Sequence, residues 1–158
     1  MPMRKRVLVL TGLWLPLTCF GLAAAIPSLA TADAYGVGSR IPPVSAEDQH
    51  GTPHRIDASV RIVLFSRDMP GGDVLKSALE ESDPDLLDRA GAVYVADISR
   101  MPRLVTRLFA LPGMRRRPYR MLLDRDGTLT RDFPDMEGKA TLIHLDSLRV
   151  VRIEYIDS

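Results

Sequence analysis

The segment IVLFSRDMPGGDVLKSAL, from Ile62 to Leu79, carries the strongest structural signal in the chain. Its first four residues are a continuous apolar run, which is typical of a β-strand covered on both faces. The residues from Ser66 to Gly72 include Pro-Gly-Gly and predict a loop. Asp73 is a favourable N-cap, and the apolar residues after it recur at helical spacing. This order predicts a buried strand, a loop and a helix.

The alternation of strands and helices continues towards the C-terminus. Residues 92–98 and 120–123 are apolar runs that predict two more strands. Between them, Pro102 suits a first helical turn, and an apolar stripe predicts a second helix that closes at residues 111–113. The stripe consists of Leu104, Val105, Leu108 and Phe109. These elements predict two right-handed βαβ units.

Two hairpins are predicted at the ends of this arrangement. Residues 44–48 and 53–56 flank a turn that contains Gly51, and residues 141–145 and 150–156 flank Asp146 and Ser147. The pattern as a whole predicts an α/β sandwich, with a mixed central sheet between an N-terminal β-hairpin and a C-terminal β-hairpin. With 158 residues, 46% of them hydrophobic, the chain has the composition of one globular domain.

The N-terminal 32 residues have the pattern of a secretory signal peptide. A basic run, Arg4 to Arg6, precedes an uncharged stretch, and Ala30-Thr31-Ala32 supplies a small-residue cleavage site. An alternative site ends at Ala34, and an uncleaved membrane anchor is the competing interpretation. We expect removal of residues 1–32, a single mature domain over residues 33–158, and a periplasmic location.

Cleavage would change both the charge and the chemistry of the chain. It removes three of the 21 basic residues and none of the 20 acidic ones, so the formal charge falls from +1 to −2. This charge gives no reason to expect nucleic acid as a partner. Cleavage also removes Cys19, which is the single cysteine. Thiol–disulfide and peroxidase chemistry by the mature chain's own cysteine is therefore excluded.

Several blocks of the sequence resemble the redoxins of the thioredoxin superfamily. Residues 37–38, 41–44 and 47–51 are similar to the entry hairpin of that family. The blocks LLDRDG, from Leu122, and TLIHLD, from Thr141, resemble two of its later strand-and-turn units. The resemblance covers roughly residues 36–158 in the expected order. It implies a thioredoxin-like fold.

The chain departs from the redoxins where their chemistry takes place. In that family the loop after the first buried strand carries the reactive cysteine, often as C-x-x-C, and a cis-proline faces it. Here the loop carries Met69-Pro70-Gly71-Gly72, and Ala140 stands at the proline position, where we expect a trans bond. The vacated loop is the expected contact surface for a ligand or partner. Its residues are Arg67, Asp68, Met69, Pro70, Gly71 and Gly72, together with Ala140.

Arg67 and Asp68 also have a simpler interpretation. They stand at the carboxyl end of a central strand, which is the edge where open α/β sheets bind ligands. A surface Arg–Asp pair accounts for them without any ligand, and this is the interpretation that the sequence favours.

Other motifs have ordinary structural explanations. The sequence from Asp124 to Leu129 resembles the first motif of haloacid-dehalogenase phosphatases, but a strand-ending turn explains it, with local bonds worth about 1 kcal/mol. His50 and His54 beside Asp48 suggest a metal site, yet a solvated turn is favoured, and we expect no metal.

Two further groups of side chains are also assigned structural roles. The basic cluster 115–117 with Arg120 is interpreted as a solvated loop. His144 lies within a predicted strand and is interpreted as a half-buried structural histidine.

These observations favour a secreted, non-catalytic binding or accessory module. Its partner would be a protein or a small-molecule ligand of unidentified kind. We expect no resident cofactor, no nucleic acid and no stable membrane insertion after cleavage. The alternative is a thiol-independent enzyme, such as a flavin-dependent oxidoreductase. No sequence constellation identifies a reaction.

Overall fold

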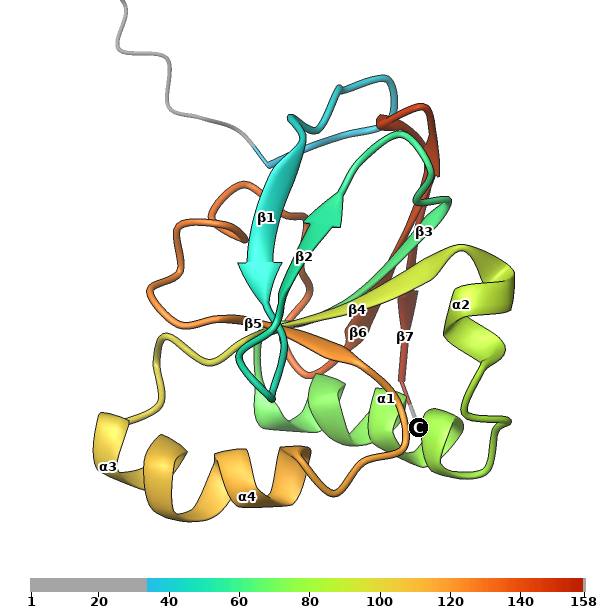
Figure 1. The fold of residues 1–158 in the computed structure, drawn as a ribbon. Helices are drawn as coiled ribbons and strands as arrows, with labels where there is room; N and C mark the ends of the chain where they lie inside the picture. The colour runs from blue at the N-terminus through green and yellow to red at the C-terminus, as the bar shows by residue number, and fades with distance from the viewer. Residues whose placement is uncertain (1–33, 158) are drawn as a thin grey trace, which may run out of the picture. The chain divides into compact units, whose positions relative to one another are not determined.

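The computed structural model describes residues 34–157 (Figure 1). The predicted signal peptide, residues 1–32, lies outside the described residues. Within the part of the chain that is described, no helix has both the length and the hydropathy to cross a membrane.

The centre of the structure is a five-stranded mixed sheet, in the order β5-β4-β3-β6-β7. The three strands β3, β4 and β5 run parallel, whereas β6 is antiparallel to β3 and β7 is antiparallel to β6. Their bounds are β3 Ile62–Ser66, β4 Ala92–Asp97, β5 Met121–Asp124, β6 Ala140–Asp146 and β7 Arg149–Ile156. The predicted mixed sheet and C-terminal hairpin are confirmed.

The predicted N-terminal hairpin is also present, as a separate two-stranded sheet. It consists of β1, Val44–Glu47, and β2, Pro53–Ile56, in antiparallel pairing. Asp48 forms an isolated bridge to Leu122, which attaches this hairpin to the edge strand β5 of the large sheet.

Helices provide the crossovers between the parallel strands. The first crossover, from β3 to β4, contains α1, Met69–Glu80, and α2, Leu86–Ala90. The second, from β4 to β5, is one continuous helix in three parts, which we call the α3–α4 helix. These parts are α3, Arg103–Val105, the π-helical segment Thr106–Ala110, and α4, Leu111–Met114.

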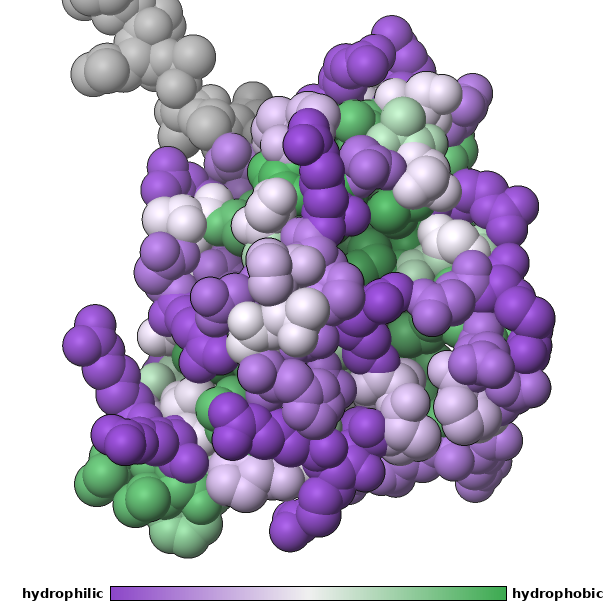
Figure 2. Space-filling model, in the orientation of Figure 1, coloured by the Kyte–Doolittle hydropathy of each residue, from purple (hydrophilic) through white to green (hydrophobic). Residues whose placement is uncertain are grey.

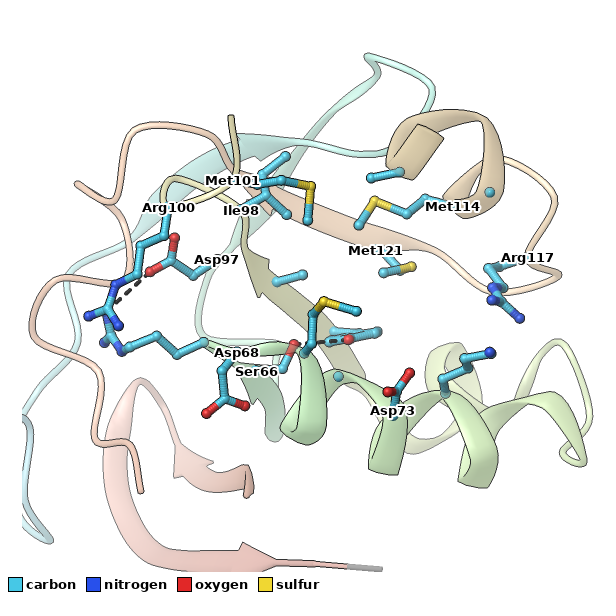
Figure 3. Close-up of a pocket in the computed structure, with 18 of the residues that line it drawn as sticks. Ser66, Asp68, Asp73, Asp97, Ile98, Arg100, Met101, Met114, Arg117 and Met121 are labelled. Atoms are coloured by element: carbon cyan, nitrogen blue, oxygen red, sulfur yellow. Dashed lines mark hydrogen bonds and ion pairs between the residues drawn. The ribbon is translucent and has the colours of Figure 1, made fainter. Parts of the chain in front are cut away.

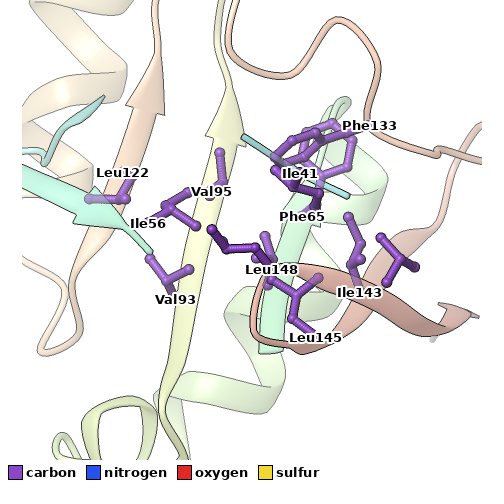
Figure 4. Packing of buried hydrophobic residues seen from close by; sticks show 12 residues of the cluster. Ile41, Ile56, Phe65, Val93, Val95, Leu122, Phe133, Ile143, Leu145 and Leu148 are labelled. Atoms are coloured by element: carbon purple, nitrogen blue, oxygen red, sulfur yellow. The ribbon is translucent and has the colours of Figure 1, made fainter. Parts of the chain in front are cut away.

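Apolar side chains cover both faces of the large sheet. On one face, Phe65, Val95 and Leu122 of the sheet pack with Ile56 of the hairpin and with Phe133 (Figure 4). On the other face, the side chains of α1 pack against the sheet. The buried residues of this second cluster include Leu75, Leu79, Tyr94, Met121, Leu123 and Ala140. Because β3 and β4 are covered on both faces, their sequences are nearly continuous apolar runs.

Helix α1 begins five residues earlier than the sequence predicted. The N-cap is Asp68 rather than Asp73, and its Oδ1 accepts a hydrogen bond of 2.8 Å from the N–H of Gly71. Pro70 fits the first turn because a proline has no N–H that would need a partner there. The predicted loop over residues 66–72 is therefore wrong. Met69, Pro70, Gly71 and Gly72 form the first turn of the helix.

The two glycines of this turn have different surroundings, and we expect different effects of substitution. A Cβ added at Gly71 would lie 2.4 Å from the backbone oxygen of Lys139, whereas one at Gly72 would have only ordinary contacts. Gly71→Ala should lower the free energy of unfolding by about 1–3 kcal/mol, since backbone must move. Gly72→Ala should leave it unchanged or raise it by up to about 1 kcal/mol through helix propensity. Urea denaturation of both variants measures the difference, and equal stabilities would contradict the close approach.

The second helix differs from the prediction in two ways. It continues to Met114 instead of closing at residues 111–113. Pro112 has no N–H to donate to the regular hydrogen-bond ladder of an α-helix. The π-helical segment just before it interrupts that ladder, so the helix can continue through the proline. Its apolar stripe also does not face the core. All four residues of the stripe are exposed: Leu104, Val105, Leu108 and Phe109.

Candidate functional site

A cavity of about 680 Å³ opens at the carboxyl ends of β3 and β4 (Figure 3). Ser66 and Asp97, the last residues of these two strands, form its floor together with residues of β4 and β5. The first turn of α1 and the α3–α4 helix also line the cavity. We call this cavity the sheet-edge pocket.

Much of the lining is apolar and flexible. Four methionines contribute to it: Met69, Met101, Met114 and Met121. Phe109 and Tyr119 add aromatic surface. Methionine side chains are unbranched and polarisable, so they adapt to ligands of irregular shape. The volume lies within the range of about 300–1,000 Å³ that small-molecule sites occupy.

A buried pair of hydroxyl groups lies on the floor of the sheet-edge pocket. The Ser66 Oγ and Tyr94 Oη atoms are 3.0 Å apart. Burial, with smaller contributions from Tyr119 and Asp73, outweighs the Ser66 hydrogen bond and raises the pKa of Tyr94 to about 12. Tyr94 therefore stays protonated at neutral pH. The two hydroxyl groups can exchange hydrogen bonds with a polar group of a ligand and so orient it.

Arg67 holds one side of the pocket in place. Its guanidinium lies 3.2 Å from Asp97 Oδ2 and 3.1 Å from Asp135 Oδ2. It also donates to the backbone oxygens of Thr130, at 2.7 Å, and Phe133, at 3.2 Å. The favoured interpretation of Arg67 and Asp68 as a surface pair is therefore wrong, because Arg67 is mostly buried and reaches across to the segment before β6.

Asp68 has a separate structural role. Besides capping α1, it accepts a hydrogen bond of 2.7 Å from the N–H of Gly138 through Oδ2. One carboxylate thus ties the start of α1 to the turn before β6. This tie places Gly71 against Lys139, which is why a side chain at Gly71 has no room.

The structure brings together only part of the site predicted from sequence. Four of the seven residues line the sheet-edge pocket: Arg67, Asp68, Met69 and Gly72. Pro70, Gly71 and Ala140 do not, and Ala140 is fully buried in β6. Residues 34–157 contain no cis peptide bond, so the bond before Ala140 is trans as predicted.

Comparisons with known proteins identify the fold. No family model and no curated protein matches the sequence. Among solved structures, the thioredoxin domain of a thiol-disulfide oxidoreductase from Bacteroides vulgatus has a TM-score of 0.52 at 13% identity, covering 79% of this chain and 91% of that one. The chain has a thioredoxin-like fold.

Two other solved structures have similar scores. A Chlorobium tepidum protein assigned as a thiol:disulfide interchange protein DsbE has a TM-score of 0.52 at 13% identity, covering 78% of this chain and 87% of that one. A hypothetical protein from Sinorhizobium meliloti has a TM-score of 0.54 at 17% identity, covering 80% of this chain and 74% of that one. At these identities the likeness establishes the fold alone.

Within this thioredoxin-like fold, the wall formed by the α3–α4 helix was not predicted. Val105, Phe109 and Met114 belong to it. The apolar stripe was visible in the sequence as a signal, but it was interpreted as the buried face of a helix. Sequence periodicity shows that a helix has an apolar face, and it does not show whether that face meets a core or a cavity.

The motifs outside the pocket have structural roles in the thioredoxin-like fold. The His54 Nε2 atom lies 2.9 Å from Asp48 Oδ2, and the His144 Nε2 atom lies 2.6 Å from Glu154 Oε1. Among residues 34–157, no three His, Cys, Asp or Glu side chains gather closely enough to hold a metal ion.

The basic cluster is not simply a solvated loop. Arg117 pairs with Glu80 and Arg120 pairs with Asp88, while Arg115 donates to the backbone oxygen of Gln49. These partners fix the segment that leads from the α3–α4 helix into β5.

Proposed function

We propose that this protein is a non-catalytic binding module that acts in the periplasm. In this proposal the sheet-edge pocket takes an apolar ligand at the place where redoxins keep their reactive cysteine. The main support for this proposal is the sheet-edge pocket itself. A cavity of about 680 Å³ with four methionines in its lining suits an apolar ligand.

The absence of a thiol in the pocket supports binding rather than thiol exchange. The resemblance to the redoxins aligns their C-x-x-C sequence with Met69 to Gly72, which form the first turn of α1. The single cysteine of the chain, Cys19, precedes the proposed cleavage site. The sheet-edge pocket therefore offers surface and hydrogen bonds, without a nucleophilic sulfur. The basic run and the Ala30-Thr31-Ala32 site support export.

Two substitutions at Gly72 test the occupancy of the pocket. Gly72 lines it, and a Cβ there would lie 3.7 Å from Ser66 Oγ, so the backbone tolerates a side chain at this position. We expect Gly72→Phe to fill the pocket and to weaken binding of the apolar dye anilinonaphthalene sulfonate at least about tenfold. Gly72→Ala is the matched control and should bind the dye as the unaltered protein does.

Methionine methyl NMR locates the bound dye. The methyl signals of Met69, Met101, Met114 and Met121 should shift on titration, while that of Met136, which does not line the pocket, should not. Dye affinity that is unaltered in Gly72→Phe, or shifts confined to Met136, would contradict the proposal. A purified protein with the visible absorption of a flavin would instead favour the enzymatic alternative.

A further inference from the structure

The α3–α4 helix is attached to the rest of the protein much more weakly than α1. None of its residues from Arg103 to Met114 is buried, whereas α1 buries Gly71, Leu75 and Leu79. Only Leu111 and Met114 are packed in part against the core. In water, isolated helices shorter than about 12–15 residues are marginally stable, and most helices in proteins gain their stability from packing. A surface that covered this helix would supply the missing packing.

The exposed side of the helix is apolar. Leu104, Leu108 and Phe109, which we call the apolar ridge, are 69%, 55% and 72% exposed. Figure 2 shows hydrophobic atoms gathered at the corner of the molecule where α3 and α4 lie in Figure 1, with hydrophilic side chains beside them. Leu104 and Leu108 do not line the sheet-edge pocket, so a ligand there would leave them exposed. Contiguous exposed apolar side chains mark an interaction surface.

The chain segment that carries the apolar ridge is basic. The sequence has seven arginines and no acidic residue between Asp97 and Asp124. Five of these arginines are exposed and make no ion pair with any other residue of the described segment: Arg100, Arg103, Arg107, Arg115 and Arg116. A partner that covers the ridge would therefore be apolar at the contact and negatively charged around it.

We propose that the α3–α4 helix binds peripherally to an anionic lipid bilayer. A helix with leucine and phenylalanine on one side and arginines beside them lies in the plane of a membrane interface, with its apolar side chains among the acyl chains. Each arginine near an anionic surface adds electrostatic attraction. The two leucines of the ridge lie outside the sheet-edge pocket, and hydrophobic atoms protrude at the corner of the molecule where this helix lies, so the ridge fits a planar surface better than a peptide (Figure 2).

Vesicle cosedimentation tests the apolar part of this contact. The protein is recovered from the periplasm in its exported form, and all variants are compared in that form, because residues 7–25 are themselves apolar. Binding is measured to vesicles of phosphatidylglycerol with phosphatidylcholine and to vesicles of phosphatidylcholine alone. Replacing both leucines, Leu104→Ser with Leu108→Ser, should weaken binding to the anionic vesicles at least about tenfold. Val151→Ser, on an exposed apolar side chain of β7, is the control and should bind as the unaltered protein does.

A second pair of variants tests the charge. Arg103→Gln with Arg107→Gln should weaken binding to the anionic vesicles about 30-fold, and raised salt should do the same to the unaltered protein. Arg131→Gln removes an exposed arginine elsewhere and should change binding little. Gly72→Phe should keep full vesicle affinity, so this proposal and the pocket proposal fail separately.

Three results would overturn the lipid proposal. One is equal binding to anionic and neutral vesicles. Another is vesicle binding that the double leucine variant retains. The third is that the protein binds neither kind of vesicle but dimerises, or binds an acidic peptide, through the apolar ridge. That result would assign the ridge to a protein partner.

Discussion

Arg67→Met should lower the free energy of unfolding by about 3–5 kcal/mol, which is the largest effect we expect from a single substitution. The guanidinium compensates Asp97, whose side chain is only 2% exposed, and supplies donors to the backbone oxygens of Thr130 and Phe133. Methionine keeps an unbranched apolar stem but removes the guanidinium that lies over the ring of Phe65, and it leaves the carboxylate and both carbonyls without these partners. Equilibrium unfolding in urea measures the change.

A matched surface variant separates this effect from a general loss of charge. Arg125 lies 4.0 Å from Glu47 in a pair whose two side chains are both more than two-fifths exposed. Arg125→Met should therefore change stability by less than about 1 kcal/mol. An Arg67→Met protein as stable as Arg125→Met would show that Asp97 does not depend on Arg67.

Asp124→Ala should cost about 2–4 kcal/mol of unfolding free energy. The carboxylate accepts hydrogen bonds from the N–H of Gly127 at 2.9 Å and from both the N–H and the Oγ1 of Thr130 at 2.8 Å. Asp124 and Thr130 are buried, so water does not replace the lost acceptor. The value exceeds the cost of about 1 kcal/mol expected for an ordinary turn aspartate.

The neighbouring aspartate provides the control for this prediction. Asp126 is exposed and accepts bonds only from Thr128, so Asp126→Ala should cost less than about 1 kcal/mol. Thermal unfolding of the two variants side by side gives the comparison. Equal losses would mean that the turn, and not the buried carboxylate, stabilises this end of β5.

The fold could be predicted because its strongest signals are local. The runs at Ile62 and Ala92 are apolar throughout, since the strands that they form are covered on two faces. The two hairpins could be predicted from the turn residues between their strands. The start of α1 was predicted at the wrong residue, because Asp68 and Asp73 are equally good N-caps by residue type. The tie from Asp68 to Gly138 that distinguishes them spans 70 residues.

Only one side of the sheet-edge pocket could be predicted from local sequence signals. The residues contributed by the start of α1 follow the first strand directly, so their place at the sheet edge could be predicted. The opposite wall belongs to the α3–α4 helix, whose apolar stripe gives the same periodic signal whether it faces a core, a pocket or solvent. The partners of Arg67 lie far away in sequence, Asp97 at 30 residues and Thr130 and Phe133 at more than 60, and nothing near Arg67 indicates them.

The outer strand β7 forms an edge of the large sheet, where another chain could add a strand. Residues 38–41 cover the start of its far side, where Arg40 bridges Arg149 and Val150 exchanges hydrogen bonds with Gly38 and Ser39. Beyond Val150, no other strand of residues 34–157 pairs with this side, and a free edge of this kind is a template for strand addition and aggregation. Arg149, Arg152 and Glu154 place charges of both signs along this strand. A strand added here would have to accommodate these charges, so this edge favours a sheet that remains closed to further strands.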